Sequence, residues 1–534
     1  MSGKFGAFFV CFLIPLRLFS QMQPAEGAKL HYRMITFSVP RSPKADKYKV
    51  EVAAGNYNAE ALFDKNIVVS ASGNTGTIIV TVPSFGKEYT WQMVYTGKSK
   101  TTKSGLYHFT TGSVPETDTT LVRLRLINPA TEKYRDDYVF IDGNRALYDM
   151  NGNVVWYLPD MNGLANPKAI IRDMKITSVG TITFMSDDKA YEINYNGEVL
   201  WKAPNTGVVN GENNEHYHHE FQRLANGHYM IMGMESVPWK SKVPVTVDAN
   251  LPPAMQSRML QDTGTHKTTF GTIIEYDNSG KVVWSWKSSK YFIGSDLEYY
   301  NPAFRMPTTD VHENSFYFDE KNNMIYVNFK GIARIVKVKY PEGNVVRAYG
   351  EVYKPGSKEQ GNGLFCDEHS CRLSSEGYIY LYNNNACTGE QAIPTVEMLQ
   401  EPQSDTGTLK KVWEYVCNTA GVNANPNNKV MEQNQKMAVQ RNRDLHLQNA
   451  FKMHPTSGGH VLEMPDHSMF ICMNTEYCKL FIVDRDKKIQ WSAVPEKYNQ
   501  NTKEWRISAQ QYRASIISAQ DLESLVRKGV KAGS

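Results

Sequence analysis

Short apolar runs rich in β-branched and aromatic residues alternate with polar positions between residues 28 and 112. A period of two over such short runs predicts β-strands and argues against helices. Gly, Asn, Ser and Pro separate the runs, as expected of turns. The runs are 48–52, 66–69, 77–82, 89–94 and 106–111.

The last two runs are joined by a Gly-Lys-Ser-Lys turn. A closing hairpin of this kind is typical of an immunoglobulin-like or fibronectin type III β-sandwich. A natural boundary follows at Pro115 and the Thr-rich stretch after it. We therefore predict a small N-terminal β-sandwich domain over 28–112.

Beyond residue 120 one pattern recurs six times: a β run, a turn with Asn, Gly or charge, and a β-branched pair that mostly ends in Trp. Each copy is expected to form a hairpin in which Gly or Asn supplies the positive φ of the turn. The spacing leaves room for one four-stranded blade per copy, so we predict an all-β chain with a six-bladed β-propeller over 120–515. An open multi-sheet β protein is the alternative. The copies are 147–156, 193–201, 274–284, 338–347, 408–413 and 481–491.

The two ends of the chain are expected to lie outside these domains. Lys4 precedes the apolar run Phe5–Leu16, which is too short to span a bilayer and typical of a signal peptide. We predict a signal peptide over 1–20 and a periplasmic or otherwise exported protein without a membrane span. An N-terminal strand or an uncleaved anchor is the alternative. Helical apolar spacing near the other end predicts a C-terminal helical tail over 516–534.

Cysteine usage agrees with export. Six cysteines follow Cys11, and an even number in an oxidising compartment predicts disulfide bonds. The close pairs Cys366/Cys371 and Cys472/Cys478 could each close a small loop, and the alternative for the six cysteines is that they are buried thiols. None of the six has the paired C-x-x-C spacing of a zinc site.

The charge balance excludes one class of function. Lys plus Arg number 59 and Asp plus Glu 55, which leaves a net charge of +4. A nucleic-acid-binding protein would instead show a concentrated basic surface. We expect no nucleic-acid partner.

A second repeat brings histidines into one register. His219 and His369 each precede a turn Gly by eight residues, and His312 fits with one residue added, whereas His460 fits more loosely. In a propeller, equivalent positions meet around one axis, so these histidines are expected to lie close together. Such a cluster can ligate a metal, with Glu220 or Asp310 as oxygen ligands. Alternatively, one imidazole is a nucleophile and the others serve acid–base or charge-stabilising roles.

Four motifs in this order resemble the bacterial arylsulfate sulfotransferases, over residues 125–515. They are the Gly-x-Val-Val-Trp hairpins, His218-His219-Glu-Phe, Asp310-x-His312-x-Asn314-Ser, and Glu368-His369 before a Tyr-Asn-Asn-Asn turn. The resemblance implies transfer of a sulfuryl group from an aryl sulfate donor to a phenolic acceptor by a ping-pong mechanism. It implies a sulfohistidine intermediate, no cofactor, and a homodimer as one oligomeric state.

The resemblance also implies a role for each matching residue. His369 matches the histidine that becomes sulfated, and His219 and His312 match the two supporting histidines. Lys330 stands where the family has a channel arginine, and a lysine cannot form a bidentate fork on sulfuryl oxygens. We expect His219, His312 and Lys330 to supply a positive field. Further substrate-binding candidates are Asn314, His218 and, as a substitute for the missing arginine, Arg334.

Two other functions fit the same residues. A cell-surface propeller that binds a glycan or a peptide would use the histidines structurally. A metal-dependent propeller enzyme would use them as ligands, although the resemblance implies no metal. Tyr512 and Arg513 are further candidates for lining the channel.

Overall fold

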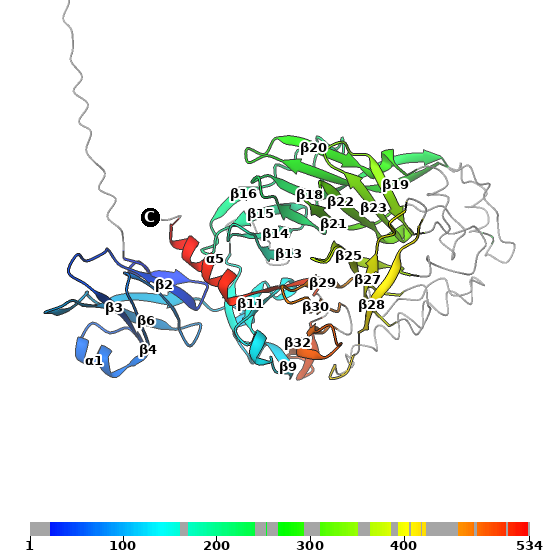
Figure 1. The fold of residues 1–534 in the computed structure, drawn as a ribbon. Coiled ribbons are helices and arrows are strands. Elements are labelled where there is room, and N and C mark those ends of the chain that lie inside the picture. The colour runs from blue at the N-terminus through cyan, green and yellow to red at the C-terminus, as the bar shows by residue number, and fades with distance from the viewer. Residues whose placement is uncertain are drawn as a thin grey trace, which may run out of the picture. The chain divides into compact units, whose positions relative to one another are not determined.

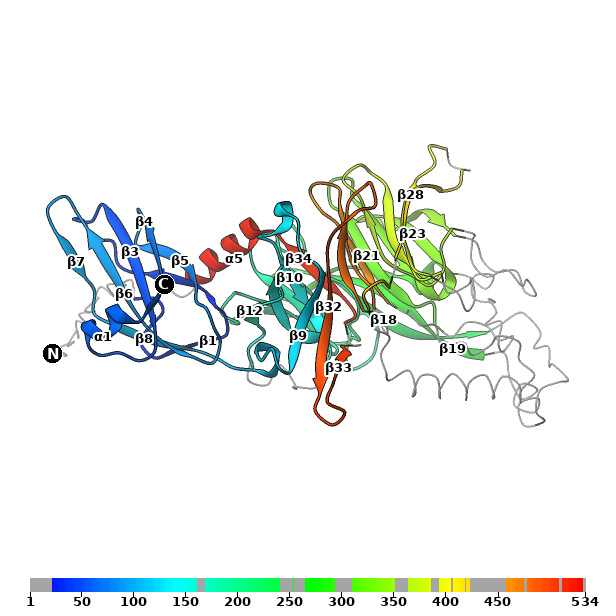
Figure 2. The same ribbon diagram turned by 90° about the horizontal axis from the view of Figure 1, so that it is seen from below.

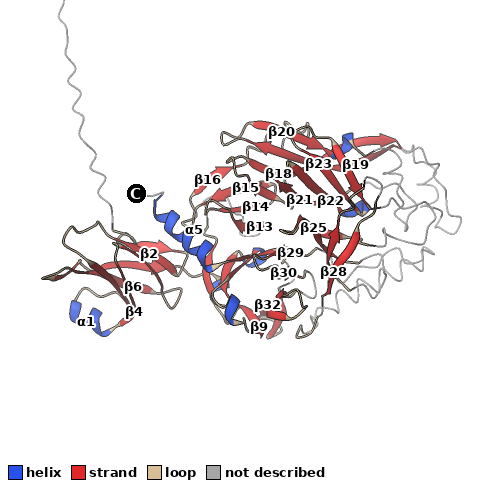
Figure 3. Cartoon of the chain, viewed as in Figure 1, coloured by secondary structure: helices blue, strands red, loops and turns tan. Residues whose placement is uncertain are grey.

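The computed structural model divides into two compact units, one of residues 1–112 with 526–534 and one of residues 113–525. Strands dominate both (Figure 3), which confirms the all-β prediction. The predicted signal peptide lies outside the described residues. Within the described ranges no helix is long and apolar enough to cross a membrane. The structure describes residues 22–160, 169–240, 253, 265–292, 310–350, 364–385, 393–404, 407–417, 419–422, 458–474, 478–508 and 511–531.

The first unit has two sheets that share one hydrophobic core. Its strands are β1 (Ala28–Leu30), β2 (Met34–Ser38), β3 (Lys47–Ala54), β4 (Ile67–Gly73), β5 (Thr77–Thr81), β6 (Glu88–Thr96), β7 (Thr101–Lys103) and β8 (Tyr107–Thr111), with helix α1 (Glu60–Lys65) between β3 and β4. The larger sheet has the order β1-β8-β6-β3-β4, with β7 on β6, and the smaller pairs β2 with β5. Phe37 of β2 packs on Trp91 of β6, with ring centroids 5.2 Å apart, and this contact joins the two sheets.

The second unit, as far as it is described, has six antiparallel sheets. The first combines β10 (Tyr138–Ile141), β11 (Ala146–Asp149) and β12 (Val154–Tyr157) with β34 (Ala514–Ile517). The second has β13 (Ile171–Ile176), β14 (Ile182–Ser186), β15 (Lys189–Ile193) and β16 (Val199–Lys202). The third has β17 (Phe221–Arg223), β18 (Tyr229–Lys240), β19 (Thr265–Tyr276) and β20 (Val282–Lys287).

The last three sheets follow the same plan. The fourth has β21 (Glu313–Asp319), β22 (Met324–Phe329), β23 (Arg334–Lys339) and β24 (Val345–Tyr349). The fifth has β25 (Glu368–Leu373), β26 (Ile379–Asn383), β27 (Thr395–Gln400) and β28 (Lys410–Val416). The sixth has β29 (His460–Glu463), β30 (Met469–Cys472), β31 (Leu480–Val483), β32 (Ile489–Asn499) and β33 (Glu504–Ile507), and β9 (Val122–Asn128) pairs with β32 (Figure 2). Short 3₁₀ helices are η1 (Pro115–Thr117), η2 (Glu132–Tyr134), η3 (Asp142–Asn144), η4 (Ser288–Lys290) and η5 (Lys330–Ile332).

The six sheets form a cycle in which each contacts the next and the sixth contacts the first. Apolar side chains fill the spaces between neighbours, for example Phe270 of β19 and Phe316 of β21 in one cluster. We call β34, β13, β17, β21, β25 and β29 the inner strands, because each is the edge strand at the same end of its sheet. Contacts across sheets join β13 to β34, β34 to β29, β29 to β25 and β25 to β21. In Figure 1, β13, β21, β25 and β29 lie toward the middle of the second unit.

Strand β34 completes the first sheet from the far end of the chain. It runs antiparallel to β10, with Ala514 opposite Ile141. The strand extends across position 515, the predicted end of the second domain. Helix α5 (Ala519–Lys531) follows, and its residues from Val526 onward belong to the first unit.

Five of the six Trp-repeat copies occupy the third and fourth strands of their sheets, counted from the inner strand, and the copy at 408–413 lies at the fourth strand β28 alone. Their side chains link neighbouring sheets: the indole N–H of Trp491 donates to the carbonyl of Met150, 3.0 Å away, across the junction of the sixth and first sheets. Where the repeat has Arg347, its guanidinium donates to the carbonyl of Ser404 in the fifth sheet instead. The same type of indole contact joins Trp156 to Tyr195 and Trp413 to Arg485.

The two predicted small disulfide loops are wrong. Cys371, Cys472 and Cys478 are buried free thiols, as is Cys417. Strand β25 is extended and holds Cys371 in the apolar cluster between the fourth and fifth sheets, where its side chain packs as a small hydrophobe. Cys478 packs in the same way with Val494 and Ile507.

Candidate active site

The three histidines of the second repeat meet where the inner strands converge. His219 comes just before β17, His312 directly before β21, and His369 is the second residue of β25. The ring centroids of His219 and His312 are 5.7 Å apart. The ring of Tyr512, just before β34, lies 5.3 Å from that of His219 and 6.2 Å from that of His369. The register prediction therefore brings together residues from three sheets, and a fourth supplies the tyrosine between them.

Left-handed backbone marks this region. His219 has φ 59° and His312 has φ 51°, and Ser370, directly after His369, has φ 56°. Residues with a Cβ rarely adopt such angles, and conformations of this kind concentrate at functional sites. Those at His312 and Ser370 occur at or beside the β-bulges of β21 and β25, which redirect side chains.

The imidazole of His369 is buried and has a defined orientation. Its Nδ1 lies 3.0 Å from the carbonyl oxygen of Asp367. The amide nitrogen of Asn384 also lies 3.1 Å from Nδ1, but its two N–H groups donate to the carbonyls of Asp367 and Gly458. Because a carbonyl only accepts hydrogen bonds, Nδ1 carries the proton and Nε2 keeps a lone pair. The amide of Asn384 donates to the same carbonyl, 2.8 Å away, and holds this segment in place. Burial, and next the charge of Lys330, hold the pKa of His369 well below its usual range. The ring is therefore neutral at physiological pH.

His218 and His219 form a second oriented pair. His218 Nε2 lies 3.0 Å from the carbonyl oxygen of Gly233, so this nitrogen carries the proton. His218 Nδ1 then accepts a hydrogen bond from His219 Nδ1, 2.6 Å away, which leaves Nε2 of His219 with its lone pair. Burial lowers the pKa of His218 to about 4 and that of His219 well below its usual range.

His312 is the most exposed of the three, with 37% of its side chain accessible. Its Nδ1 lies 3.1 Å from a carboxylate oxygen of Asp310, and its backbone N–H donates to the other oxygen at 2.7 Å. Although burial alone would raise it, the pKa of Asp310 is lowered by His312. A carboxylate behind an imidazole fixes the ring and leaves Nε2 directed elsewhere, which suits acid–base work.

The other predicted residues divide into two groups. Lys330, the first residue of η5, forms an ion pair of 3.0 Å with Asp367 beside His369. Asn314 donates to the hydroxyl of Tyr512 at 2.8 Å, and its side-chain oxygen has no hydrogen-bond partner among the described residues. Arg334 is buried at the start of β23, opposite Phe329. Lys330 and Asn314 therefore lie beside the histidine cluster, through Asp367 and Tyr512 respectively. Arg334 forms the second group, because its position is defined only within the fourth sheet.

A buried ionic network lies next to the histidines and was not predicted as such. Glu220 accepts from Lys175 and Arg372, both 2.9 Å from one oxygen, and from Arg513, 2.7 Å from the other. Arg513 also pairs with Asp173 at 3.0 Å. Burial would raise the pKa of Glu220, but these three cations hold it well below its usual range. Glu220 and Arg513 were candidates for other roles, whereas neither a motif nor a charge run marks Lys175, Arg372 or Asp173 in the sequence.

The network corrects two expectations. Glu220, a candidate oxygen ligand in the metal alternative, is bonded by three cations instead. His219, expected to add positive charge, is neutral because it is buried. The positive field at the site comes from lysine and arginine side chains.

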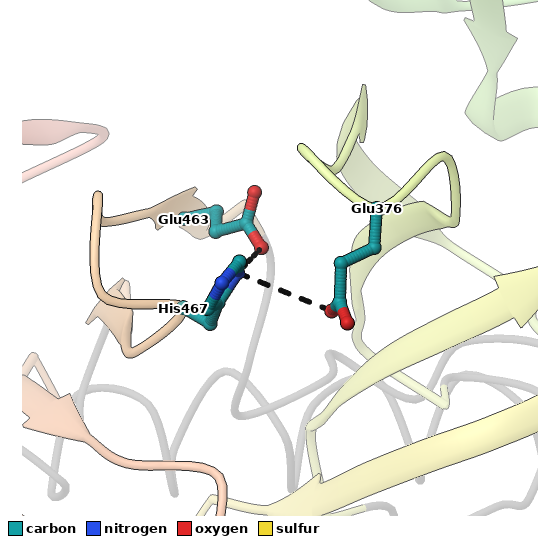
Figure 4. Close-up of side chains that lie close together, drawn as sticks. All are labelled: Glu376, Glu463 and His467. Atoms are coloured by element: carbon teal, nitrogen blue, oxygen red, sulfur yellow. Dashed lines mark hydrogen bonds and ion pairs between the residues drawn. The ribbon is translucent and has the colours of Figure 1, made fainter.

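A different group has the composition of a metal site. Glu376, Glu463 and His467 lie close together at the β25–β26 and β29–β30 hairpins (Figure 4). His467 Nδ1 is 3.3 Å from Glu463 and 4.0 Å from Glu376. The guanidinium of Arg485 pairs with both carboxylates, at 2.5 Å and 3.3 Å. Arg485 already supplies the cation that these carboxylates would otherwise attract.

The fold and the site together define a class: an all-β protein in which histidines at the starts of three inner strands lie close together among lysine and arginine side chains. Residues 250–420 match the family model described as Arylsulfotransferase (ASST), which confirms the resemblance over that part of the chain. This segment contains His312 and His369. No curated protein matches the chain.

Two solved structures are similar to the chain at low identity. A protein of unknown function from Bacteroides caccae is 12% identical, with a TM-score of 0.37, and the match covers 74% of this chain and 99% of that one. The Myceliophteria thermophila Cps50 (Swd1) β-propeller domain is 8% identical, with a TM-score of 0.29, over 68% of this chain and 88% of that one. Because both TM-scores are low, neither likeness carries an argument about this chain.

Proposed function

We propose that the protein is an aryl-sulfate sulfotransferase that works by a ping-pong mechanism through a sulfohistidine at His369. We propose equally that the six sheets are the blades of a six-bladed β-propeller and that the first unit is a β-sandwich. The observation that carries the enzymatic proposal is the His369 ring, neutral and oriented by a backbone carbonyl. An attacking nitrogen must be unprotonated, and its partner nitrogen must be held, for such chemistry to be efficient.

In the first half-reaction, Nε2 of His369 attacks the sulfur of the donor. The N–S bond forms, the ester S–O bond breaks, and the phenoxide leaves with the electron pair of that bond. Protonated His312, oriented by Asp310, gives the phenoxide its proton. The sulfated ring keeps its Nδ1 proton and becomes positive, and the carbonyl of Asp367 accepts from it. Lys330 faces the charge that develops on the sulfuryl oxygens.

The second half-reaction reverses these steps with another phenol. Its oxygen attacks the sulfur, its proton passes to His312, and the N–S electron pair returns to Nε2 of His369. Protons and electrons then balance over the cycle without a cofactor. Export after removal of residues 1–20, a homodimer and disulfide bonds remain predictions.

The intact mass of the purified protein tests the proposal. We expect one added SO₃ group after brief exposure to an aryl sulfate without acceptor, and its loss when a phenol is added. His369→Ala should never form the adduct, whereas His467→Ala, a matched change at an exposed hairpin histidine, should behave like the wild type.

Absence of both adduct and released phenol with several aryl sulfates would contradict the proposal and favour a binding function. Release of phenol that a chelator abolishes would favour the metal-dependent alternative.

A further inference from the structure

Arg172 occupies the same place in the second sheet that His369 occupies in the fifth. Arg172 directly precedes a left-handed residue, Asp173 at φ 56°, as His369 precedes Ser370. In both inner strands the ladder shifts register over the following three residues, from Arg172 to Lys175 and from His369 to Arg372.

The residues at which the two register shifts end, Lys175 and Arg372, are also in equivalent places. Lys175 Nζ and Arg372 Nη2 each lie 2.9 Å from the same oxygen of Glu220. Two strands that share a bulge and converge on one carboxylate are related by the repeat of the sheets. The residues that begin the shifts, Arg172 and His369, are therefore expected to face the same space.

The surroundings of Arg172 support this placement. Its guanidinium carbon lies 5.6 Å from the centre of the Tyr512 ring, the ring that contacts both His219 and His369. A cation over an aromatic face is held in position by the ring. The charge of Arg172 also contributes, after burial and other neighbours, to the lowered pKa of His219.

Arg172 differs from the other cations near the histidines. Lys330 is paired with Asp367, and Arg372 and Arg513 are paired with Glu220. For Arg172 the described part of the chain offers no carboxylate partner, and its Nε, like those of Arg372 and Arg513, is buried without a hydrogen-bond partner among the described residues. Arg172 itself is only partly buried, so its charge lacks a carboxylate partner while part of the side chain stays accessible. A buried N–H without an acceptor is costly, and an anionic ligand would offset that cost.

We propose that Arg172 is the guanidinium that binds the sulfuryl oxygens of the donor. Its planar fork matches two oxygens of a tetrahedral anion, which the ammonium of Lys330 cannot do. Arg172 thus supplies, from the second sheet, the fork that is missing at position 330 in the fourth. This inference deepens the proposed function and rests on it for the identity of the donor.

The test measures binding of inorganic sulfate by calorimetry and the KM for an aryl sulfate. Arg172→Gln should weaken sulfate binding and raise the KM by at least about tenfold, and Arg172→Lys should show an intermediate loss. Arg347→Gln is the matched control, because Arg347 also lies over a ring, at 5.8 Å from that of Tyr349, in the outer strand β24. It should leave both quantities unchanged.

Sulfate affinity and KM within twofold of the wild type in Arg172→Gln would overturn the inference. A loss confined to the KM of the phenolic acceptor would overturn it as well. Sulfate binding needs no turnover, so the inference is tested even if the wild type forms no sulfohistidine. If Arg172→Gln does not fold, Arg172→Lys keeps the charge over Tyr512 and decides the outcome.

Discussion

The Nδ1 atoms of His218 and His219 lie 2.6 Å apart, and one proton lies between them. Because His218 is itself fixed by the carbonyl of Gly233, the pair determines which nitrogen of His219 is free. His218 therefore affects the site through its neighbour, as a positioning residue. The contact depends on the left-handed backbone of His219, which lets consecutive side chains meet.

Replacement of His218 should change which nitrogen of His219 carries the proton, and should affect substrate binding less. We expect His218→Gln to lower kcat about tenfold with a small change in KM, in line with the loss of other orienting partners. Nitrogen NMR of the histidines should show mixed tautomers for His219 in the variant. His216→Gln, an exposed neighbour, should change neither, and an unaltered His219 spectrum in His218→Gln would refute the positioning role.

Stability should fall at mildly acidic pH because buried histidines resist protonation. Burial lowers the pKa of His218 to about 4, whereas an unfolded histidine titrates near pH 6.5. The unfolded chain therefore binds the extra proton first, and the free energy of unfolding falls as the pH drops from about 6.5 to about 4, by up to about 3 kcal/mol for this residue. Denaturant titrations across this range should show a shallower loss in His218→Gln.

Loss of the charge of Lys330 should move the acidic limb of the activity profile. Lys330 is the leading cause, after burial, of the lowered pKa of His369. Lys330→Gln should therefore raise that pKa, so that the acidic limb of kcat/KM shifts to higher pH and the maximal rate falls about tenfold or more. Lys330→Arg should leave the limb in place. If the acidic limb does not move in Lys330→Gln, the charge of Lys330 does not control the pKa of His369.

Glu368 should be a source of instability at alkaline pH. It is fully buried, neither of its oxygens has a hydrogen-bond partner among the described residues, and burial raises its pKa well above the usual range. Stability associated with a raised carboxyl pKa is present below about pH 4.5 and is lost as the pH rises. We expect Glu368→Gln to raise the free energy of unfolding by about 1–3 kcal/mol at pH 8 and by little at pH 4.5. The exposed Glu88→Gln is the control, and equal gains at both pH values would be inconsistent with this explanation.

The junction of the sixth and first sheets should depend on Trp491. Its ring is fully buried and its N–H donates to the carbonyl of Met150. Trp491→Phe removes the donor and leaves a carbonyl unsatisfied, so a loss of about 1–3 kcal/mol is expected. Thermal unfolding should show this loss of stability in Trp491→Phe. Trp505→Phe, on the outer strand β33, is the control and should lose less. Equal losses in the two variants would argue that ring volume, and not the bond, is what matters.

The sequence was informative where a pattern repeats. The Trp hairpins and the shared register of His219, His312 and His369 both follow from a unit repeated along the chain, and each copy supports the others. Arg347 breaks the Trp pattern, yet its guanidinium still reaches the next sheet and takes over the link.

Single residues without a repeat could not be found in that way. Arg172 and Arg513 come from separate inner strands, and their partners depend on how the sheets converge. The predicted disulfide pairs were wrong because proximity along the chain does not determine where each thiol points in the fold. Cys371 and Cys478 point into apolar clusters between elements.

Strand β34 reaches β10 only after five other sheets have been synthesised. Until then β10 is an open edge, with unpaired backbone groups that any extended chain can join. A nascent chain therefore carries an exposed strand for nearly the whole of its synthesis, and its long-range closure is slow by nature. Proteolysis just before β34 would be expected to yield an aggregating fragment in place of a shortened protein.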